Sequence, residues 1–139
     1  MVLPPPQPAP FSENGPERHV RRLLLVDDER QILELLDLSL SSHGFEVMTA
    51  QSGEAALALA RAQRYDLIVL DVLMTPWDGF RTARELKRLS GCPPIVFLSG
   101  MSGLSYEEQG LSLGAAYLNK PFRPAQLIEM IWRVLDEES

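Results

Sequence analysis

Five polar side chains suited to a cation or phosphate site each follow or end an apolar run of the chain. Asp27 and Asp28 come directly after the first run, and Asp71 ends a later one. Ser99 and Lys120 close two further runs in the same way. If these runs are parallel strands, their carboxyl ends lie along one edge of a sheet, where ligands of such folds bind. Taken singly, each residue is better explained as a helix cap, a turn residue or a solvated side chain, but together the five predict a shared site.

Three carboxylates at one site repel one another, since two unit charges about 4 Å apart cost about 4 kcal/mol at an effective dielectric near 20. A hard divalent cation offsets this repulsion, and Mg²⁺ suits one or two carboxylates together with waters and phosphate oxygens. Lys120 adds a compact positive charge and Ser99 a hydroxyl donor, both suited to a phosphoryl group. A carboxylate beside the metal can act as a nucleophile and form an aspartyl phosphate. Asp71 is the expected acceptor because it ends the central run.

These side chains need a parallel sheet to bring them together, and the chain has the pattern of one. Short runs that are apolar on both faces alternate five times with segments of helical periodicity. The pattern predicts an α/β, doubly wound domain with right-handed crossovers and helices on both faces of the sheet. The expected strands are Leu23–Val26, Phe45–Ala50, Leu67–Leu70, Ile95–Leu98 and Ala116–Leu118, and the expected helices contain Ile32–Leu40, Ala56–Ala60, Phe80–Leu89, Leu104–Leu113 and Leu127–Leu135.

The composition is that of one ordinary globular domain with an acidic bias. The 139 residues are 45% hydrophobic and 23% charged, with a formal net charge of −6, which excludes collagen, a coiled coil and disorder throughout. No apolar run reaches the roughly 18–20 residues of a membrane helix, and the first residues lack a signal peptide, so no export is expected. Cys92 is the only cysteine, which suits a reducing cytoplasm. A sequence pI near 4.9 argues against direct nucleic-acid binding.

The first 20 residues differ from the rest and are expected to form a disordered, proline-rich tail. Six of the 11 prolines lie there. Proline removes amide donors, and the segment offers little apolar surface to bury. A proline-rich ligand segment at Pro4–Pro8 is the weaker alternative. The predicted organisation is therefore a tail over 1–20 and a single domain over 21–139.

Several short motifs, taken in order, resemble the receiver domain of two-component response regulators. The likeness runs from about Leu23 to Leu135, and its specificity lies in the order and spacing of the motifs. It implies a flavodoxin-like, five-stranded sheet with strand order 2-1-3-4-5. The motifs are Leu25-Val26-Asp27-Asp28-Glu29, Leu70-Asp71, Asp78-Gly79, Leu98-Ser99-Gly100 and Tyr117-Leu118-Asn119-Lys120-Pro121-Phe122.

The resemblance implies a phosphorylation-operated signalling switch that catalyses only its own phosphoryl transfer and autodephosphorylation. Asp71 accepts a phosphoryl group from a histidine kinase or phosphotransfer protein, and a downstream effector protein responds. Asp27, Asp28, Asp71 and the backbone carbonyl of Leu73 hold Mg²⁺ or Mn²⁺, with Asp27 acting mainly through a water. Leu73 and Met101 flank the path of a hydrolytic water, and neither side chain can orient it. We therefore expect slow self-dephosphorylation.

The resemblance also assigns roles around the phosphoryl group. Lys120 contacts it, and the Lys120–Pro121 bond is expected to be cis. Ser99 and Tyr117 form a switch pair, in which the hydroxyl is drawn toward the phosphoryl group while the aromatic ring turns inward.

Two segments depart from the pattern of the family. Thr75 stands four residues after the acceptor, where proline is usual, and Pro76 and Trp77 follow it. The family pattern therefore does not predict the backbone path of residues 73–77. The segment Gly114–Tyr117 is one residue shorter than usual, which affects a face that many receivers use for dimerisation. We therefore expect a weak homodimer at most.

Two other functions compete with the signalling switch. A Mg²⁺-dependent phosphatase with an aspartate nucleophile needs Asp-x-Asp after the first strand, whereas this chain has Asp27-Asp28-Glu29. A receiver-like adaptor binds partners without phosphorylation, but such domains usually lose an acid, hydroxyl or lysine position, and all are present here. A dinucleotide is not expected, because no Gly-x-Gly-x-x-Gly follows the first strand.

Two features remain without a functional prediction. The third expected helix carries Arg81, Arg84, Lys87 and Arg88, which are most simply explained as a solvated face.

The chain ends soon after the last expected helix, so we expect either a stand-alone regulator or a fragment.

Overall fold

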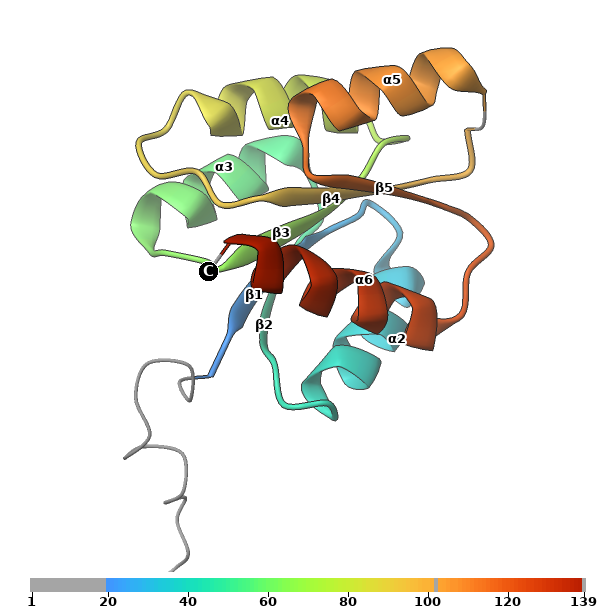
Figure 1. Ribbon diagram of the computed structural model, residues 1–139. Coiled ribbons are helices and arrows are strands. Elements are labelled where there is room, and N and C mark those ends of the chain that lie inside the picture. The colour runs from blue at the N-terminus through green and yellow to red at the C-terminus, as the bar shows by residue number, and fades with distance from the viewer. Residues whose placement is uncertain (1–19, 102, 139) are drawn as a thin grey trace, which may run out of the picture.

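The computed structural model describes residues 20–101 and 103–138. The predicted tail lies outside these residues except for Val20, which is exposed, so the tail stays a prediction. In the described ranges the chain forms three layers, with a five-stranded sheet between two layers of helices (Figure 1).

The sheet has the predicted order, β2-β1-β3-β4-β5, and every neighbouring pair of strands is parallel. The predicted fold class is therefore confirmed. Strand bounds differ from those expected by one residue at most, as at Phe45, which lies just before its strand. The strands are β1 (Arg22–Val26), β2 (Glu46–Ala50), β3 (Leu67–Asp71), β4 (Ile95–Ser99) and β5 (Ala116–Asn119).

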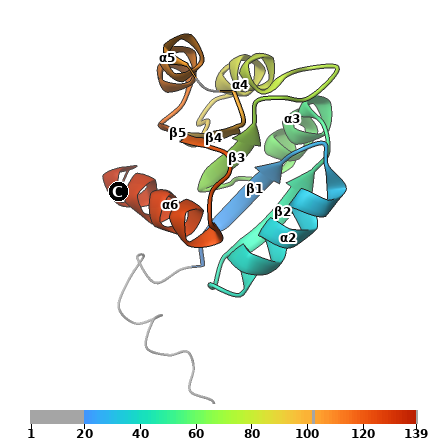
Figure 2. The same ribbon diagram turned by 90° about the vertical axis from the view of Figure 1, so that its right-hand side faces the viewer.

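Helices cover both faces of the sheet, as predicted. Figures 1 and 2 show α2 (Arg30–Ser41) and α6 (Pro124–Glu138) on one face. The other face carries α3 (Gly53–Ala62), α4 (Gly79–Lys87) and α5 (Leu104–Leu113). None of the helices in the described ranges is long and apolar enough to cross a membrane.

The alternation of side chains along the inner strands fills two separate cores. In β1, Leu23 and Leu25 point into the core beneath α2 and α6, whereas Leu24 and Val26 join the core beneath α3 and α4. All four are fully buried. Because successive side chains of a strand point to opposite faces, a strand covered on both sides must be apolar throughout. This is why the sequence of β1 is a continuous apolar run.

Two helices on the same face begin at side-chain caps. The hydroxyl of Ser52 accepts a hydrogen bond from the amide of Ala55 at 3.0 Å, and a carboxylate oxygen of Asp78 accepts one from the amide of Arg81 at 2.8 Å. Each cap satisfies a backbone donor that the first turn of a helix leaves free. The cap at Asp78 also fixes where the loop after β3 ends.

The substitution Ser52→Ala is expected to lower the free energy of unfolding by about 1 kcal/mol, because it removes the cap of α3. Urea denaturation followed by circular dichroism measures the change. Ser90→Ala is the matched control, since Ser90 is exposed and lies outside the helices. Equal stabilities of the two variants would contradict the capping role.

Candidate functional site

The carboxyl ends of β1 and β3 bring three carboxylates together. Asp27 follows β1, and Asp71 is the last residue of β3; they are 1% and 3% exposed. Asp28 is exposed beside them. One carboxylate oxygen from each of the three lies within 4.8 Å of the others. The parallel register of β1 and β3 places both strand ends at one edge, so the cluster follows directly from the sheet.

Lys120 supplies a positive charge to this cluster. It follows β5, and its amide donates a hydrogen bond to the carbonyl of Ser99 at 2.8 Å. Its ammonium nitrogen lies 2.9 Å from Asp71 Oδ1 and 3.8 Å from Asp27 Oδ2. One lysine thus pairs with two buried carboxylates at once. The Lys120–Pro121 peptide bond is cis, as the resemblance implies.

Burial and mutual repulsion perturb the acids. Burial raises the pKa of Asp71 to about 6, and the charge of Asp27 adds to this, while the neighbouring ammonium of Lys120 acts against it. Burial also raises the pKa of Asp27, against a hydrogen bond from the amide of Glu29. Burial lowers the pKa of Lys120, but the neighbouring carboxylates outweigh it, so the net direction is upward. Lys120 therefore stays charged and only partly compensates the acids.

Two oxygens of the cluster are left unsatisfied. Asp27 Oδ2 and Asp71 Oδ1 are buried and have no hydrogen-bond partner among the described residues, and the contact of Lys120 with Asp71 is an ion pair without hydrogen-bond geometry. Buried acceptors without partners are costly, so such a pair points to a missing ligand. Carboxylate oxygens are the ligands that Mg²⁺ prefers. These residues therefore fit a divalent cation held by Asp27, Asp28 and Asp71.

The loop from β3 to α4 is held close to the acceptor by Gly79. Its amide donates to the carbonyl of Val72 at 2.8 Å, and a Cβ on Gly79 would overlap the carbonyl oxygen of Asp71 and lie 2.7 Å from the Cα of Val72. Only glycine permits this approach of α4 to the end of β3. Within the loop, the side chain of Leu73 is 65% exposed. The role of its carbonyl as a metal ligand stays a prediction.

The altered residues of this loop have a definite structure. The Thr75–Pro76 bond is cis. Trp77 is half-buried and packs against the core, and the guanidinium of Arg81 lies 4.6 Å from the centre of its ring. The helix cap at Asp78 then restores the usual register. Within this loop, the departure from the family pattern is therefore confined to 75–77.

The backbone of Met101 connects Ser99 and Tyr117. The hydroxyl oxygen of Ser99, fully buried at the end of β4, accepts a hydrogen bond from the amide of Met101 at 2.8 Å. The carbonyl of Met101 accepts one from the hydroxyl of Tyr117 at 2.9 Å. The ring of Tyr117 is 9% exposed and turned inward. Each end of the predicted switch pair is thus bonded to the same residue.

The inward position of Tyr117 depends on a glycine of α5. A Cβ on Gly110 would overlap the ring of Tyr117, and three ring carbons lie within 3.3 Å of that point. Gly110 is a buried residue of α5, and this helix forms over the predicted residues although glycine disfavours a helix interior. The glycine therefore leaves the room that the ring occupies.

Comparison with known proteins identifies the family. Residues 23–132 match the family model described as the response regulator receiver domain. The chain belongs to this family. The receiver domain thus accounts for nearly all of the chain that the structure describes.

Relatives in sequence and in structure agree with this assignment. The chain is 39% identical over 112 residues to "Probable transcriptional regulator ycf27" of Cyanophora paradoxa, a match covering 80% of the chain and 46% of that protein. It is 36% identical over 116 residues to "Alkaline phosphatase synthesis transcriptional regulatory protein PhoP" of Bacillus subtilis, covering 83% and 48%. The chain spans about half the length of these curated relatives. The chemotaxis response regulator CheY4 of Vibrio cholerae superposes with a TM-score of 0.78 at 33% identity, covering 84% of this chain and 99% of that one.

The receiver structure brings together four of the five side chains that the sequence singled out, and it places Ser99 beside them through the backbone. Asp27, Asp28, Asp71 and Lys120 lie within one cluster, and Ser99 is bonded to Lys120 through the backbone. Sequence reasoning missed the clearance at Gly79 and at Gly110, and the two bonds to the peptide of Met101. The Asp78-Gly79 motif was the only signal for the first of these, and none marked the others.

The substitution Gly110→Ala is expected to drive the ring of Tyr117 out of its inward position, because the new methyl group overlaps it. Nitration by tetranitromethane, mapped by mass spectrometry, reports the exposure of each tyrosine. In the parent, Tyr106 at 38% exposure reacts faster than Tyr65 and Tyr117, at 8% and 9%. The variant should raise the reactivity of Tyr117 toward that of Tyr106.

Two controls accompany this measurement. Tyr65 packs in the core away from α5 and should stay slow in every variant. Gly100→Ala is the matched substitution, since a Cβ there meets nothing within 4 Å. Unchanged nitration of Tyr117 in Gly110→Ala would show that the glycine does not control the ring.

Proposed function

We propose that this receiver domain is a phosphorylation-operated signalling switch, in which Asp71 accepts a phosphoryl group from a histidine kinase or phosphotransfer protein in a Mg²⁺-dependent reaction. The observation that carries the proposal is the oxygen of Asp71 that is buried, unsatisfied and 2.9 Å from the ammonium of Lys120. A structural carboxylate would have its hydrogen bonds made within the protein.

The chemistry follows from the positions of these groups. The phosphorus–nitrogen bond of a phosphohistidine breaks as a bond forms between phosphorus and a carboxylate oxygen of Asp71, and the nitrogen keeps the electron pair. Bound Mg²⁺ supplies charge compensation for the phosphoryl oxygens. Lys120, already 2.9 Å from the acceptor, pairs with the charge that the new group brings. Outside its own acceptor, the chain is proposed to catalyse no reaction.

Ser99 and Tyr117 are proposed to carry the signal away from Asp71. If the Ser99 hydroxyl turns to the phosphoryl group, its bond with the amide of Met101 is altered, and the carbonyl of the same residue holds Tyr117. Leu104 and Leu111 are exposed on α5, the helix whose Gly110 faces this ring. A downstream effector protein that senses this face is the expected reader, and a weak homodimer through it stays a prediction.

The proposed setting is the cytoplasm, where the single cysteine, Cys92, remains a free thiol. The relatives named as transcriptional regulators are about twice as long as this chain, so their whole activity is not carried over to it.

Incubation with Mg²⁺ and acetyl phosphate is expected to add one phosphoryl group to the chain, as read by intact mass. The adduct should be absent in Asp71→Asn and absent when a chelator removes the metal. Asp136→Asn, which changes an exposed aspartate of α6, is the matched control and should be phosphorylated like the parent.

An adduct on Asp71→Asn, or one that forms without metal, would refute the proposed site. If the parent takes up no phosphoryl group from acetyl phosphate or from a kinase and also fails to bind Mg²⁺, the adaptor function replaces the switch.

The substitution Leu73→Asn is expected to shorten the lifetime of the phosphorylated state about tenfold, because an amide can orient the attacking water and leucine cannot. Loss of the adduct after removal of acetyl phosphate, followed by intact mass, gives the rate. Leu38→Asn on α2, which also changes an exposed leucine, should leave the lifetime unchanged. Equal lifetimes in all three proteins would show that position 73 does not limit hydrolysis.

A further inference from the structure

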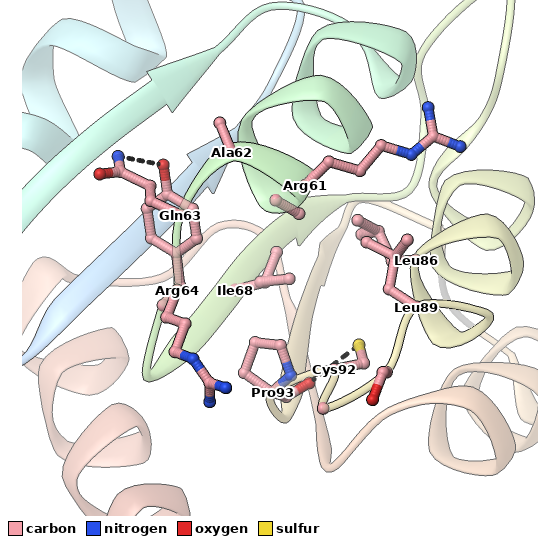
Figure 3. Close-up of a pocket in the computed structure, with 13 residues that line it drawn as sticks. Arg61, Ala62, Gln63, Arg64, Ile68, Leu86, Leu89, Cys92 and Pro93 are labelled. Atoms are coloured by element: carbon pink, nitrogen blue, oxygen red, sulfur yellow. Dashed lines mark hydrogen bonds between the residues drawn. The ribbon is translucent and has the colours of Figure 1, made fainter.

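A cavity of about 290 Å³ lies at the edge of the sheet opposite the acid cluster. It opens between the carboxyl ends of α3 and α4, beside the amino ends of β3 and β4. Figure 3 shows Ile68, Leu86, Leu89 and Pro93 around its interior. The phosphoryl chemistry uses none of these residues, so the cavity is separate from the site described above.

The rim of the cavity is basic although the chain as a whole is acidic. Arg61 and Arg64 line it, and Figure 3 shows their guanidinium groups extending outward in different directions. Both are exposed, and neither forms an ion pair with another described residue. Arg84 and Lys87 on α4 and Arg88 at its carboxyl cap are also exposed, and within the described residues Arg88 pairs with Glu85 at 3.5 Å.

The size and charge of this surface restrict what can bind it. Ligand pockets for whole small molecules measure about 300–1,000 Å³, so this cavity is at their lower limit, whereas about 150 Å³ already holds one benzene ring. The lining is mixed: Ile68, Leu86, Leu89 and Pro93 offer apolar surface for one apolar side chain, and polar groups such as Arg61 and Arg64 lie around them. A lone phosphate is disfavoured there, because α3 and α4 both direct their negative carboxyl ends toward the cavity. Carboxylates spread along a peptide can instead reach the arginines at the rim.

We propose that this surface docks an acidic peptide segment of a partner protein, which inserts one bulky apolar side chain into the cavity and pairs its carboxylates with Arg61 and Arg64. Charge complementarity selects the acidic flanks, and burial of the apolar side chain supplies affinity. Because the cavity and Asp71 lie at opposite ends of β3, such a partner binds without covering the acceptor. The docking is therefore compatible with both phosphorylation states.

Cys92 gives a direct measure of occupancy. It lines the cavity, its thiol donates to the carbonyl of Pro93 at 3.3 Å, and it is the only cysteine of the chain. A peptide seated in the cavity should therefore slow the alkylation of Cys92 by iodoacetamide.

The test selects peptides from a random displayed library against the full chain and measures the selected peptides by fluorescence anisotropy. We expect a consensus of acidic residues around one aromatic or large aliphatic residue, with binding that weakens as salt rises. The double substitution Arg61→Glu with Arg64→Glu should weaken binding about tenfold or more. The matched control, Arg123→Glu with Arg133→Glu, makes the same change of charge on exposed residues at the α6 side and should leave binding within about twofold of the parent.

Three results would overturn the proposal. These are a selection without an acidic consensus, binding that the Arg61 and Arg64 substitutions leave unchanged, and a bound peptide that does not protect Cys92. If sedimentation instead shows a concentration-dependent dimer that the double variant loses, a second copy of the chain occupies the surface. Circular dichroism of both double variants establishes that they are folded, and none of these measurements depends on phosphorylation of Asp71.

Discussion

The burial of two like charges at adjacent strand ends is the constraint around which this receiver domain is organised. Asp27 and Asp71 are almost completely buried, and a single lysine lies between them and is shared by both. Each acid has an oxygen without a hydrogen bond in the described structure. Such a cluster is costly for the fold, and a bound divalent cation would relieve this cost by offsetting the repulsion between the carboxylates. The repulsion between the buried carboxylates is therefore both the energetic cost of this site and the reason that it fits a cation.

Two glycines allow the close packing of helices around the acid cluster and Tyr117. Gly79 lets the start of α4 lie against the backbone of Asp71, and Gly110 leaves space for the ring of Tyr117 beneath α5. The backbone of Met101 then links Tyr117 to Ser99: its carbonyl accepts a hydrogen bond from the Tyr117 hydroxyl at 2.9 Å, and its amide donates one to the Ser99 hydroxyl at 2.8 Å. In the proposed switch, a change at the acceptor would reach a helix face through these short contacts between packed groups rather than by a long path.

The two ends of the sheet differ in charge as well as in chemistry. The carboxyl edge concentrates acids, whereas the opposite edge carries Arg61 and Arg64 around a cavity with a mixed polar and apolar lining. A protein with a net charge of −6 thus presents a basic surface far from its acidic site. The proposed modification and the proposed docking of a partner therefore lie at opposite edges of the sheet.

The sequence alone determined the fold class and indicated which polar side chains lie at the carboxyl ends of the strands, four of which the structure brings into one cluster. Continuous apolar runs such as β1 occur where a strand is covered on both faces, and a polar residue directly after such a run must lie at the sheet edge. The sequence did not determine the clearances at Gly79 and Gly110, the shared pairing of Lys120, or the cavity between α3 and α4. These depend on distances between segments far apart in the chain, and a local pattern carries no information about such distances. Only the packed tertiary structure decides which residues lack a hydrogen bond and which have no room for a methyl group.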